Sequence, residues 1–535
     1  MGLAGSARMY GRFVSGLPAF LRRRIDIRQA REAVRRQLDE RDDSFLHLVR
    51  RSVFEHEGSP YRPLFRLAGC EFGDLVGRVR AGGTDAALRE LREAGVYVTF
   101  DEFKGRTPIV RQGREFAVRS SDFDNPWLRH ALEARTSGST GPAARTPIDL
   151  DFTFDKALAR ALVLDAHGAL GAPTAVWRGV LPGVAGLSNV LEGVLMGNVP
   201  ERWFTPVTGA DLRTPLVYRA ATHGVLAAGR LCGVRMPRLE VVPLDDPRPI
   251  LDWVERTLRR EQRCLLRMFV STAMRLCIAA AERGLDLRGA AVFAGGEPPT
   301  PAKVRRITGA GARWIPSYAT TETSLVGLAC ANPVDENDHH VARHYLSLIQ
   351  VERPVAGWDV TVGAFYVTLF LPAAPKVMIN VETDDCGVLE PRACGCPFEA
   401  LGLEQHVREI RSYRKLTGEG VTLVQSDVVR VLEEVLPARF GGTPLDYQLL
   451  EEEDASGFTR LTLLASPRVP LPDERVVVGA VLDALRETSV AASFAAAFWR
   501  QGGSLRLRRE QPLLSAGGKF LPLTVARRLR PPAAP

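Results

Sequence analysis

The sequence predicts an α/β protein, with a large N-terminal domain of sheets layered with helices and a small mobile α+β C-terminal domain. Two observations support this fold class. Helical and strand-like apolar patterns alternate from residue 150 to about residue 330, which is typical of largely parallel sheets. Beyond residue 411, helical patterns and short strand patterns fit a small α+β unit. We expect a helical N-terminal region, a core and a C-terminal domain at residues 1–100, 101–411 and 412–530.

The first hundred residues alternate charged and apolar side chains at helical spacing, most clearly at residues 27–38 and 86–94. Residues 101–124 are mixed in composition and predict loops. Residues 126–135 fit either a short helix or an extended segment. The chain is therefore expected to enter the core through an irregular stretch.

The central region carries the α/β pattern. Helices are predicted at residues 153–167, 251–266 and 272–284, and short strands at 175–181, 290–294 and 313–316. The last two strands each lead into a polar loop. Ligands of open α/β sheets bind at the carboxyl ends of the strands, so these loops are the expected place for a site.

The last third of the chain predicts two smaller units. Strands at residues 360–371 and 376–381 indicate a small β unit. The C-terminal domain is expected to contain helices at 422–436 and 474–487 and strands at 447–453, 460–465 and 505–509. An alanine-rich apolar run at 490–499 predicts a buried helix, because it is shorter than the roughly 18 residues of a membrane span.

Composition narrows the function classes. The formal net charge is +8, but the arginines are scattered and form no stripe, so no nucleic-acid partner is expected. No apolar run is long enough to cross a membrane. Without a secretory signal pattern, the eight cysteines are expected to be reduced thiols and the protein cytoplasmic. Only six lysines occur, so each is a candidate for a specific role.

A glycine- and hydroxyl-rich loop is the strongest local signal. Its residues are Thr136, Ser137, Gly138, Ser139, Thr140 and Gly141. Glycines let backbone N–H groups approach a polyphosphate, and hydroxyls add donors. Arg145 follows at a distance from which it could reach the same phosphates. The loop lacks the spacing of a Walker motif, and the alternative interpretation is a flexible linker.

Further motifs follow in a fixed order. Two motifs come after predicted strands. The first is Gly295-Gly296-Glu297-Pro298, and the second runs from Tyr318 to Glu322 and contains Thr320 and Thr321. Thr383-Asp384-Asp385 comes after the small β unit, Arg411 precedes the C-terminal domain, and Gly517-Gly518-Lys519 lies near the end. In this order the motifs resemble the adenylate-forming superfamily of acyl-CoA synthetases, adenylation domains and luciferases. The phenylacetate–CoA ligase and acyl-protein synthetase branch is the most similar.

The resemblance implies roles for these residues. The Gly295–Glu297 loop would lie along the adenine, and Tyr318 would stack on the purine. Thr321 would donate to the α-phosphate, and Glu322 would hold Mg²⁺. Asp385 and Arg411 would bind the ribose. Lys519 would sit between the carboxylate and the α-phosphate and offset their repulsion. Simpler roles stay open for Glu322, Asp385 and Lys519: a helix N-terminal acid, a turn residue and a surface lysine.

Departures from the family pattern concern mainly the second half-reaction. The phosphate loop ends in Ala143-Ala144-Arg145 in place of Pro-Lys, and Ala319 replaces a glycine. Asp384 likewise stands where the family has glycine. No acidic residue follows Arg411 closely, so no pivot residue for a domain rotation can be named.

A possible metal site comes from the later cysteines. Some phenylacetate–CoA ligase relatives carry a Cys…His…Cys-x-Cys set that resembles a structural zinc site, and Cys330, His340, Cys394 and Cys396 match it here. His339 and Cys386 are alternative ligands. Reduced core cysteines without a metal are the simpler interpretation.

The sequence thus predicts an enzyme that uses ATP and Mg²⁺ to convert a carboxylic acid to acyl-AMP and then passes the acyl group to a thiol, with CoA as the expected acceptor. An acyl carrier protein or a protein cysteine is an alternative acceptor. A nucleotide-binding protein without catalysis is the other alternative. The acid pocket is expected near residues 183–193 and 269–274, whose apolar character favours an aromatic or acyl acid.

Overall fold

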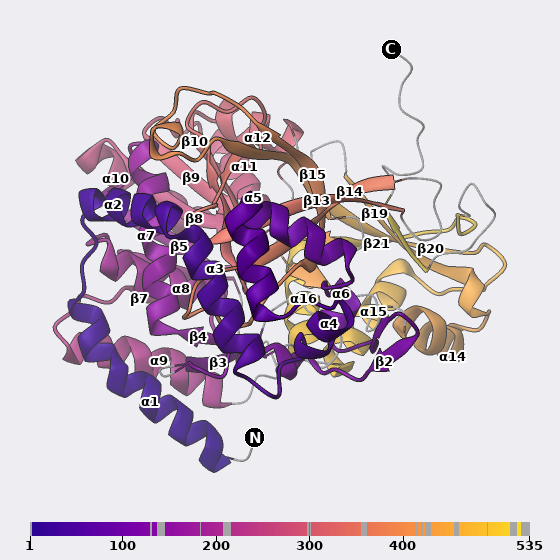
Figure 1. Cartoon of the computed structure of the whole chain (residues 1–535). Helices are drawn as coiled ribbons and strands as arrows, with labels where there is room; N and C mark the ends of the chain where they lie inside the picture. Colours follow the sequence, from indigo (N-terminus) through magenta and orange to yellow (C-terminus); the bar gives the residue numbers. More distant parts are fainter. Residues whose placement is uncertain are drawn as a thin grey trace.

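The computed structural model describes residues 3–128, 131–135, 145–181, 183–206, 216–296, 299, 301–354, 361–412, 416–418, 421–423, 428, 430–453, 459–488, 490–513 and 522–525. A 12-stranded sheet organises this part of the chain, in the order β13-β14-β15-β16-β12-β11-β10-β9-β8-β5-β6-β7 (Figure 1). The mixed α/β fold class predicted from the sequence is confirmed.

The parallel half of the sheet runs from β7 to β10. Its strands are β5 (Thr174–Trp177), β6 (Arg202–Thr205), β7 (Arg238–Val241), β8 (Cys264–Phe269), β9 (Ala290–Gly295) and β10 (Arg313–Thr320). Strands β5, β8 and β9 are buried along their whole length, as expected for parallel strands covered on both faces. The helices of this half are α7 (Leu150–Ala166), α8 (Val184–Leu195), α9 (Leu216–Leu231), α10 (Arg248–Glu261), α11 (Val270–Glu282) and α12 (Pro301–Gly309).

The other half of the sheet is antiparallel. Its strands are β11 (Ser324–Ala329), β12 (His339–Val341), β13 (Leu346–Pro354), β14 (Thr361–Leu369), β15 (Val381–Pro391) and β16 (Gln405–Ser412). A short 3-10 turn, Glu399–Leu401, precedes β16. The antiparallel half returns the chain beside the carboxyl end of β10, so side chains from both halves can meet there.

The N-terminal residues are helical, as predicted. They form α1 (Leu3–Arg22), α2 (Ile27–Asp39), α3 (Arg41–Val49), a π-helical turn (Arg50–Phe54), α4 (Arg62–Leu67), α5 (Phe72–Glu93) and α6 (Phe100–Phe103). A 3-10 turn (Ser120–Phe123) and two hairpins follow: β1 (Ile109–Arg111) with β2 (Arg114–Phe116), and β3 (Ala131–Arg135) with β4 (Arg145–Asp149). Phe45 and Leu88 from these helices share one buried core with Phe365 of β14.

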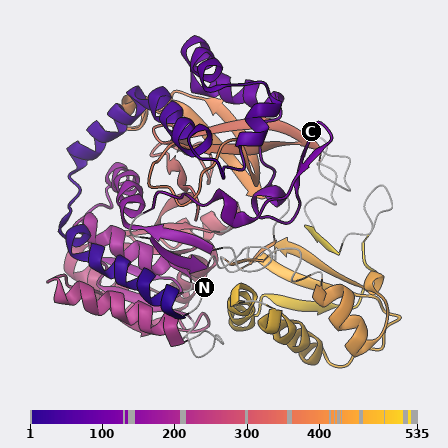
Figure 2. The same ribbon diagram turned by 60° about the horizontal axis from the view of Figure 1, so that its bottom comes forward.

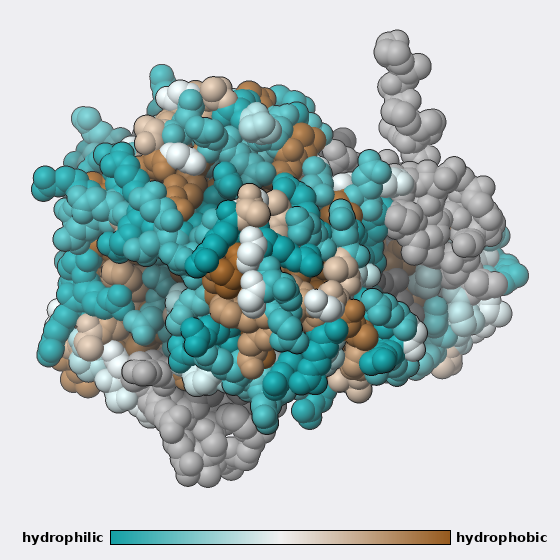
Figure 3. Space-filling view, in the orientation of Figure 1, coloured by the Kyte–Doolittle hydropathy of each residue, from teal (hydrophilic) through white to brown (hydrophobic). Residues whose placement is uncertain are grey.

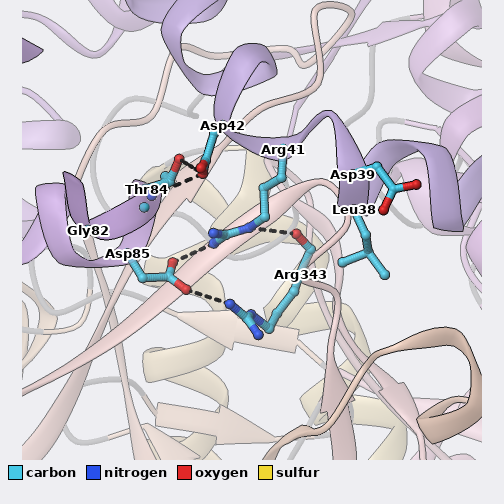
Figure 4. Close-up of a pocket in the computed structure, with 9 residues that line it drawn as sticks. Leu38, Asp39, Arg41, Asp42, Gly82, Thr84, Asp85 and Arg343 are labelled. Atoms are coloured by element: carbon cyan, nitrogen blue, oxygen red, sulfur yellow. Dashed lines mark hydrogen bonds and ion pairs between the residues drawn. The ribbon is translucent and has the colours of Figure 1, made fainter. Parts of the chain in front are cut away.

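A polar network fixes this helical region to the sheet (Figure 4). Asp85 of α5 accepts hydrogen bonds from Arg41 and from Arg343, whose Nη2 lies 2.9 Å from Asp85 Oδ2. Helix α5 is interrupted at Gly83, where φ is +77°, so Thr84 begins a second helical segment. Asp42 Oδ1 accepts from the backbone N of Thr84 at 3.0 Å and caps that segment. The network borders a cavity of about 300 Å³.

The C-terminal residues form a separate sheet, which Figure 2 shows as its own lobe in orange and yellow. Its order is β21-β20-β19-β22. The elements are a hairpin of β17 (Leu416–Gly418) and β18 (Val421–Leu423), a π-helical turn (Val431–Val435), α14 (Leu436–Phe440), a 3-10 turn (Pro444–Asp446), β19 (Tyr447–Glu453), β20 (Thr459–Ala465), α15 (Glu474–Thr488), α16 (Val490–Gly502), β21 (Leu505–Arg508) and β22 (Leu523–Val525).

Helix α16 joins this lobe to the parallel half of the large sheet. Phe498 meets Phe269 edge-on, with 6.4 Å between ring centroids. Arg275 of α11 donates to the backbone oxygen of Gly502 at 2.9 Å. The alanine-rich run at 490–499 lies within α16, so the helix predicted there is confirmed.

Three local predictions need correction. The helix expected at residues 422–436 was given too early a start: strand β18 covers 421–423, whereas residues 428 and 430–436 are helical. Residues 376–381 form no strand before Val381. Thr383 to Asp385 were expected after the small β unit, but they lie within strand β15. The pairing of β14 with β15 is irregular next to these residues, so the strand continues through them.

The surface in Figure 3 is largely hydrophilic, with apolar side chains in small clusters between charged ones. None of the helices in the described ranges is both long and apolar enough to cross a membrane.

Removal of the Asp85 carboxylate tests the network that holds the N-terminal helices. Asp85→Asn would leave Arg41, which is buried, without its anionic partner. We expect a loss of about 2–3 kcal/mol in unfolding free energy, measured by thermal or urea unfolding. Asp286→Asn is the matched control, because Asp286 pairs only with the exposed Arg288, and it should change stability by less than about 0.5 kcal/mol. Equal effects of the two variants would contradict this role.

Candidate active site

The site is built where the parallel strands β9 and β10 end. The two strands are in register, with Gly295 opposite Ser317. A Cβ atom at Gly295 would lie 2.1 Å from the backbone oxygen of Ser317, so no larger residue fits. Gly296 has φ +88°, and a Cβ there would lie 2.9 Å from the Phe269 ring. The two glycines therefore let the chain turn at a crowded strand end. Glu297, which the sequence placed in the same loop, lies outside the described residues.

Tyr318 and Asp385 meet although their strands are not neighbours in the sheet. The Tyr318 hydroxyl donates to Asp385 Oδ2 at 3.1 Å. Burial, and secondarily the Asp385 carboxylate, hold the pKa of Tyr318 well above its usual value, so its hydroxyl stays protonated. Arg411 pairs with Cys386 on the adjacent strand, which brings its backbone next to Asp385, but its side chain lies outside the description. Residues predicted to bind a purine and a ribose are thus brought together.

Asp384 explains one departure from the family pattern. Its φ is +70°, a left-handed conformation that favours glycine. The family has glycine at this position, and the conformation here is one in which glycine is unstrained. Aspartate is one of the residues that tolerate it best. The replacement therefore keeps the local geometry that orients Asp385.

Thr320 and Thr321, at the turn after β10, have different hydrogen-bonding environments. The Thr320 hydroxyl contacts the Thr323 hydroxyl at 2.9 Å and accepts from the Thr323 backbone N at 3.1 Å. Thr320 therefore closes the turn. Thr321 makes no side-chain hydrogen bond to the described residues and lines the cavity beside Gly295. Of the two, Thr321 is the one whose hydroxyl is available to a ligand.

Glu322 is buried and paired with a lysine that the sequence did not single out for the site. Lys104 Nζ lies 2.9 Å from Glu322 Oε1, and both side chains are about nine-tenths buried. Burial raises the pKa of Glu322, but Lys104 outweighs it and lowers the pKa to about 2. Glu322 is therefore ionised at neutral pH. An ionised carboxylate is the form that can hold Mg²⁺.

A cavity of about 210 Å³ opens beside these residues. Gly295, Gly296 and Thr321 line it. Residues of α7 and α8 also line it: Phe152, Val184, Ala185, Ser188, Asn189, Lys156 and Arg160. The predicted lining segments do reach the cavity, through α8 and Phe269. The lining is mixed, because three cations line the cavity beside these apolar residues: Lys156, Arg160 and Arg178.

Several predicted site residues lie outside the description of the structure. They are the phosphate-loop residues Thr136 to Gly141, the side chain of Arg145 and the catalytic candidate Lys519. Their assignments stay predictions.

A second cluster contains thiols and imidazoles. Cys330 follows β11, His340 lies on β12, Cys394 and Cys396 follow β15, and His406 lies on β16. One ligand atom from each of Cys330, His340, Cys394 and His406 lies within 4.8 Å of the others. The sequence missed His406, which is the cross-strand partner of His340, so only the strand register brings it into the cluster. His339 and Cys386, the alternative ligands, lie elsewhere: His339 contacts the Tyr318 ring, and Cys386 packs near Tyr366.

The distances in the cluster suit a tetrahedral metal. Ligand atoms on a tetrahedral zinc ion are separated by roughly 3.3–3.8 Å, given its bond lengths of about 2.0–2.3 Å. Cys330 Sγ and Cys394 Sγ are 3.8 Å apart, and Cys394 Sγ and His340 Nε2 are 3.5 Å apart. Cys396 Sγ lies only 2.9 Å from His340 Nε2, which is a hydrogen-bond distance. This thiol is therefore the fifth donor in a cluster from which a tetrahedral ion takes four.

Both imidazoles are oriented by their other ring nitrogen. His340 Nδ1 lies 2.5 Å from the Leu403 backbone oxygen, which directs Nε2 to the thiols. His406 Nδ1 lies 2.8 Å from the buried Asp338 carboxylate, while its buried Nε2 has no hydrogen-bond partner among the described residues. A carboxylate behind a histidine and an unsatisfied inner nitrogen are typical of metal ligands. The donor set thus fits a zinc ion.

Replacement of Lys104 tests the buried pair. In Lys104→Met, Glu322 would be a buried carboxylate without its main partner, so we expect a loss of roughly 3–5 kcal/mol at pH 7 in metal-free buffer. The pair lowers the pKa of Glu322 from 4.5 to about 2, so its contribution is present above pH 4.5 and is lost as pH falls towards 2. The difference from wild type in unfolding free energy should therefore shrink over that range. A pH-independent difference would contradict the account. Arg248→Met, at an exposed pair, is the control.

Comparisons with known proteins concern the fold. No family model matches the chain, and no curated protein matches it in sequence. Among solved structures, 2-hydroxyisobutyryl-CoA ligase in complex with 2-HIB-AMP and CoA, in the thioesterification state, has a TM-score of 0.50 and 15% identity over 92% of this chain and 91% of that one. The o-succinylbenzoate CoA synthetase of Bacillus subtilis has a TM-score of 0.41 and 14% identity over 73% and 68% of the two chains. An acyl-CoA synthetase (AMP-forming)/AMP-acid ligase II-like protein of Dyadobacter fermentans has a TM-score of 0.29 and 15% identity over 73% and 87%. The chain therefore has the fold of an acyl-CoA ligase, the 2-hydroxyisobutyryl-CoA ligase.

Proposed function

We propose that the protein activates a carboxylic acid with ATP, forming acyl-AMP and pyrophosphate, and then transfers the acyl group to the thiol of CoA. One observation carries the proposal. Tyr318, Thr321 and Glu322 from one motif meet Asp385 from another at the carboxyl end of β10, beside a cavity of about 210 Å³. The fold, shared with a CoA ligase that binds an acyl adenylate, supports the same activity.

The first half-reaction requires two anions to meet. A carboxylate oxygen forms a bond to the α-phosphorus, the bond from that phosphorus to the bridging oxygen breaks, and pyrophosphate leaves. Thr321 would donate to the α-phosphate oxygens, where negative charge builds. Glu322 would hold Mg²⁺, which would neutralise the leaving pyrophosphate. Lys519, as its motif implies, would lie between the carboxylate and the phosphate.

Nucleotide recognition would use the remaining residues. The loop at Gly295 and Gly296 would lie along the adenine, and Tyr318 would stack on the purine. Asp385 would accept from the ribose hydroxyls, with Arg411 beside it. The glycine- and hydroxyl-rich loop at residues 136–141, followed by Arg145, would cradle the phosphates.

The second half-reaction would bring the thiol to the acyl carbon. The sulfur attacks the carbonyl, the bond from this carbon to the phosphate oxygen breaks, and AMP leaves. The CoA complex of the fold neighbour supports CoA as the acceptor. A movement of the C-terminal lobe would remove Lys519 and admit the thiol.

We also propose a structural zinc ion in the thiol–imidazole cluster. Cys330 and Cys394 would bind it with His340, and Cys396 or His406 would supply the fourth ligand. The ion would tie the loop after β15 to strands β12 and β16. This cluster also supports assignment to the phenylacetate–CoA ligase-like branch.

Carboxylate-dependent ATP–pyrophosphate exchange tests the activity. We expect exchange with one class in a panel of aryl, fatty, dicarboxylic and amino acids, and a loss in Lys519→Ala. Thr321→Val should lower the exchange rate by about a hundredfold or more, because it removes one donor to the developing charge. Thr320→Val is the matched control: it should lower stability through the turn and change the exchange rate much less. No exchange with any acid, despite measurable ATP binding, would overturn the proposal.

Metal analysis of the purified protein tests the zinc site. We expect about one zinc per chain, and a lower melting temperature after chelation, because a metal that binds only the folded state stabilises it. Cys394→Ser should abolish the bound zinc. Cys396→Ser and His406→Asn identify the fourth ligand, since only the variant that removes it should lose affinity strongly. A zinc content near zero, unchanged stability after chelation and full retention of metal by Cys394→Ser would each count against the site.

A further inference from the structure

The cavity beside Thr321 is also lined by cations. Helix α7 contributes Lys156 and Arg160, one helical turn apart, and both side chains are nearly nine-tenths buried. Helix α8 contributes Ser188 and Asn189 to the same lining. A buried cation beside an acid-binding cavity requires an explanation, because an unpaired buried charge is strongly unfavourable.

Among the described residues, the carboxylate that pairs with these cations is that of Glu192. Glu192 of α8 has no exposed surface, and Arg267 Nη2 lies 2.7 Å from its Oε2. The Arg160 Nε lies 3.0 Å from the same oxygen, while Lys156 Nζ is 3.9 Å from Oε1. Three cations therefore surround one anion and leave a formal excess of two positive charges. The neighbouring acid on α7, Asp155, interacts with Arg23, Asp151 and Asp149.

Glu192 is satisfied without Lys156. Arg267 and Arg160 bind Oε2, and the Ser188 hydroxyl donates to Oε1 at 2.9 Å. Lys156 donates to the Ser188 oxygen at 2.8 Å, which uses one of its three N–H groups. Burial lowers the pKa of Lys156 to about 8, even though Glu192 opposes the shift. A structural role for the cluster accounts for Arg267, which is not among the residues that line the cavity, but it leaves Lys156 sharing one carboxylate with two arginines.

We propose that the acid substrate is a short dicarboxylic acid whose second carboxylate is bound by Lys156 and Arg160, where α7 lines the cavity. The proposal rests on the proposed function and names its substrate class. A second carboxylate would supply the missing negative charge and accept from the ammonium and the guanidinium.

The cavity has room for a short acid. A volume of about 210 Å³ is on the order of the space of seven water molecules, at about 30 Å³ each. A diacid of about five carbons is of this size. Phe152 and Val184 supply the apolar contact for the methylene groups between the two carboxylates.

The test compares two acids of equal carbon number, glutarate and pentanoate, in the exchange assay. Glutarate should have a kcat/KM at least thirtyfold higher, because loss of one partner of a buried charge pair has an effect of that order. In Lys156→Met, the KM for glutarate should rise by about thirtyfold or more while the value for pentanoate stays the same or falls. Arg259→Met removes an exposed surface charge and should change neither acid.

A binding measurement separates this inference from the proposed function. Glutarate alone should raise the melting temperature of the wild-type protein and not that of Lys156→Met, whereas pentanoate should raise neither. Exchange that is absent with every acid would overturn the adenylation activity, and the thermal shift would still report the anion pocket. Equal exchange with both acids, or an equal loss for both in Lys156→Met, would overturn the dicarboxylate assignment and leave the cluster with a structural role.

Discussion

The close, in-register pairing of β9 with β10 is the constraint on which the rest of the site depends. The strands approach so closely at Gly295 that a Cβ atom would meet the Ser317 backbone. Because the strands are parallel, both loops leave the sheet at the same edge. That edge holds Gly296, Thr321 and Glu322 together, and the antiparallel half of the sheet then adds Asp385. A displaced β9 would separate the groups that are proposed to hold the nucleotide from the cavity that is proposed to hold the acid.

The sequence predicted those parts of the structure that local pattern determines. Continuous apolar runs such as 290–294 indicated buried parallel strands, and the motifs after them were expected at a sheet edge. The contact of Tyr318 with Asp385 could not be derived from spacing, since 67 residues and several strands separate them. His406 was missed for the same reason: its place opposite His340 follows from strand register, which no local pattern encodes. The error at residues 422–436 has a different cause, because apolar spacing alone does not distinguish short strands from a helix.

The scarcity of lysine indicated more of the site than the motifs alone did. Six lysines occur in the chain, and Lys104, Lys156 and Lys376 all proved to be buried next to an acid. In a chain that otherwise uses arginine, a buried lysine supplies a compact charge that can approach a single carboxylate. Lys104 keeps Glu322 ionised, and Lys156 adds a cation to the lining of the cavity that is proposed to hold the acid. The electrostatics of the site thus depend on residues outside the motifs that first indicated it.

The central claim is that a carboxylate oxygen attacks the α-phosphorus of ATP. The most direct measurement uses an acid labelled with ¹⁸O in its carboxylates, chosen as the most active acid in the exchange panel, together with ATP and CoA. Mass spectrometry of the products should find one ¹⁸O atom in AMP, because the oxygen that joins carbon to phosphorus stays with phosphorus when the thiol attacks the carbon. Unlabelled AMP, or label in inorganic phosphate with ADP as the nucleotide product, would contradict the account.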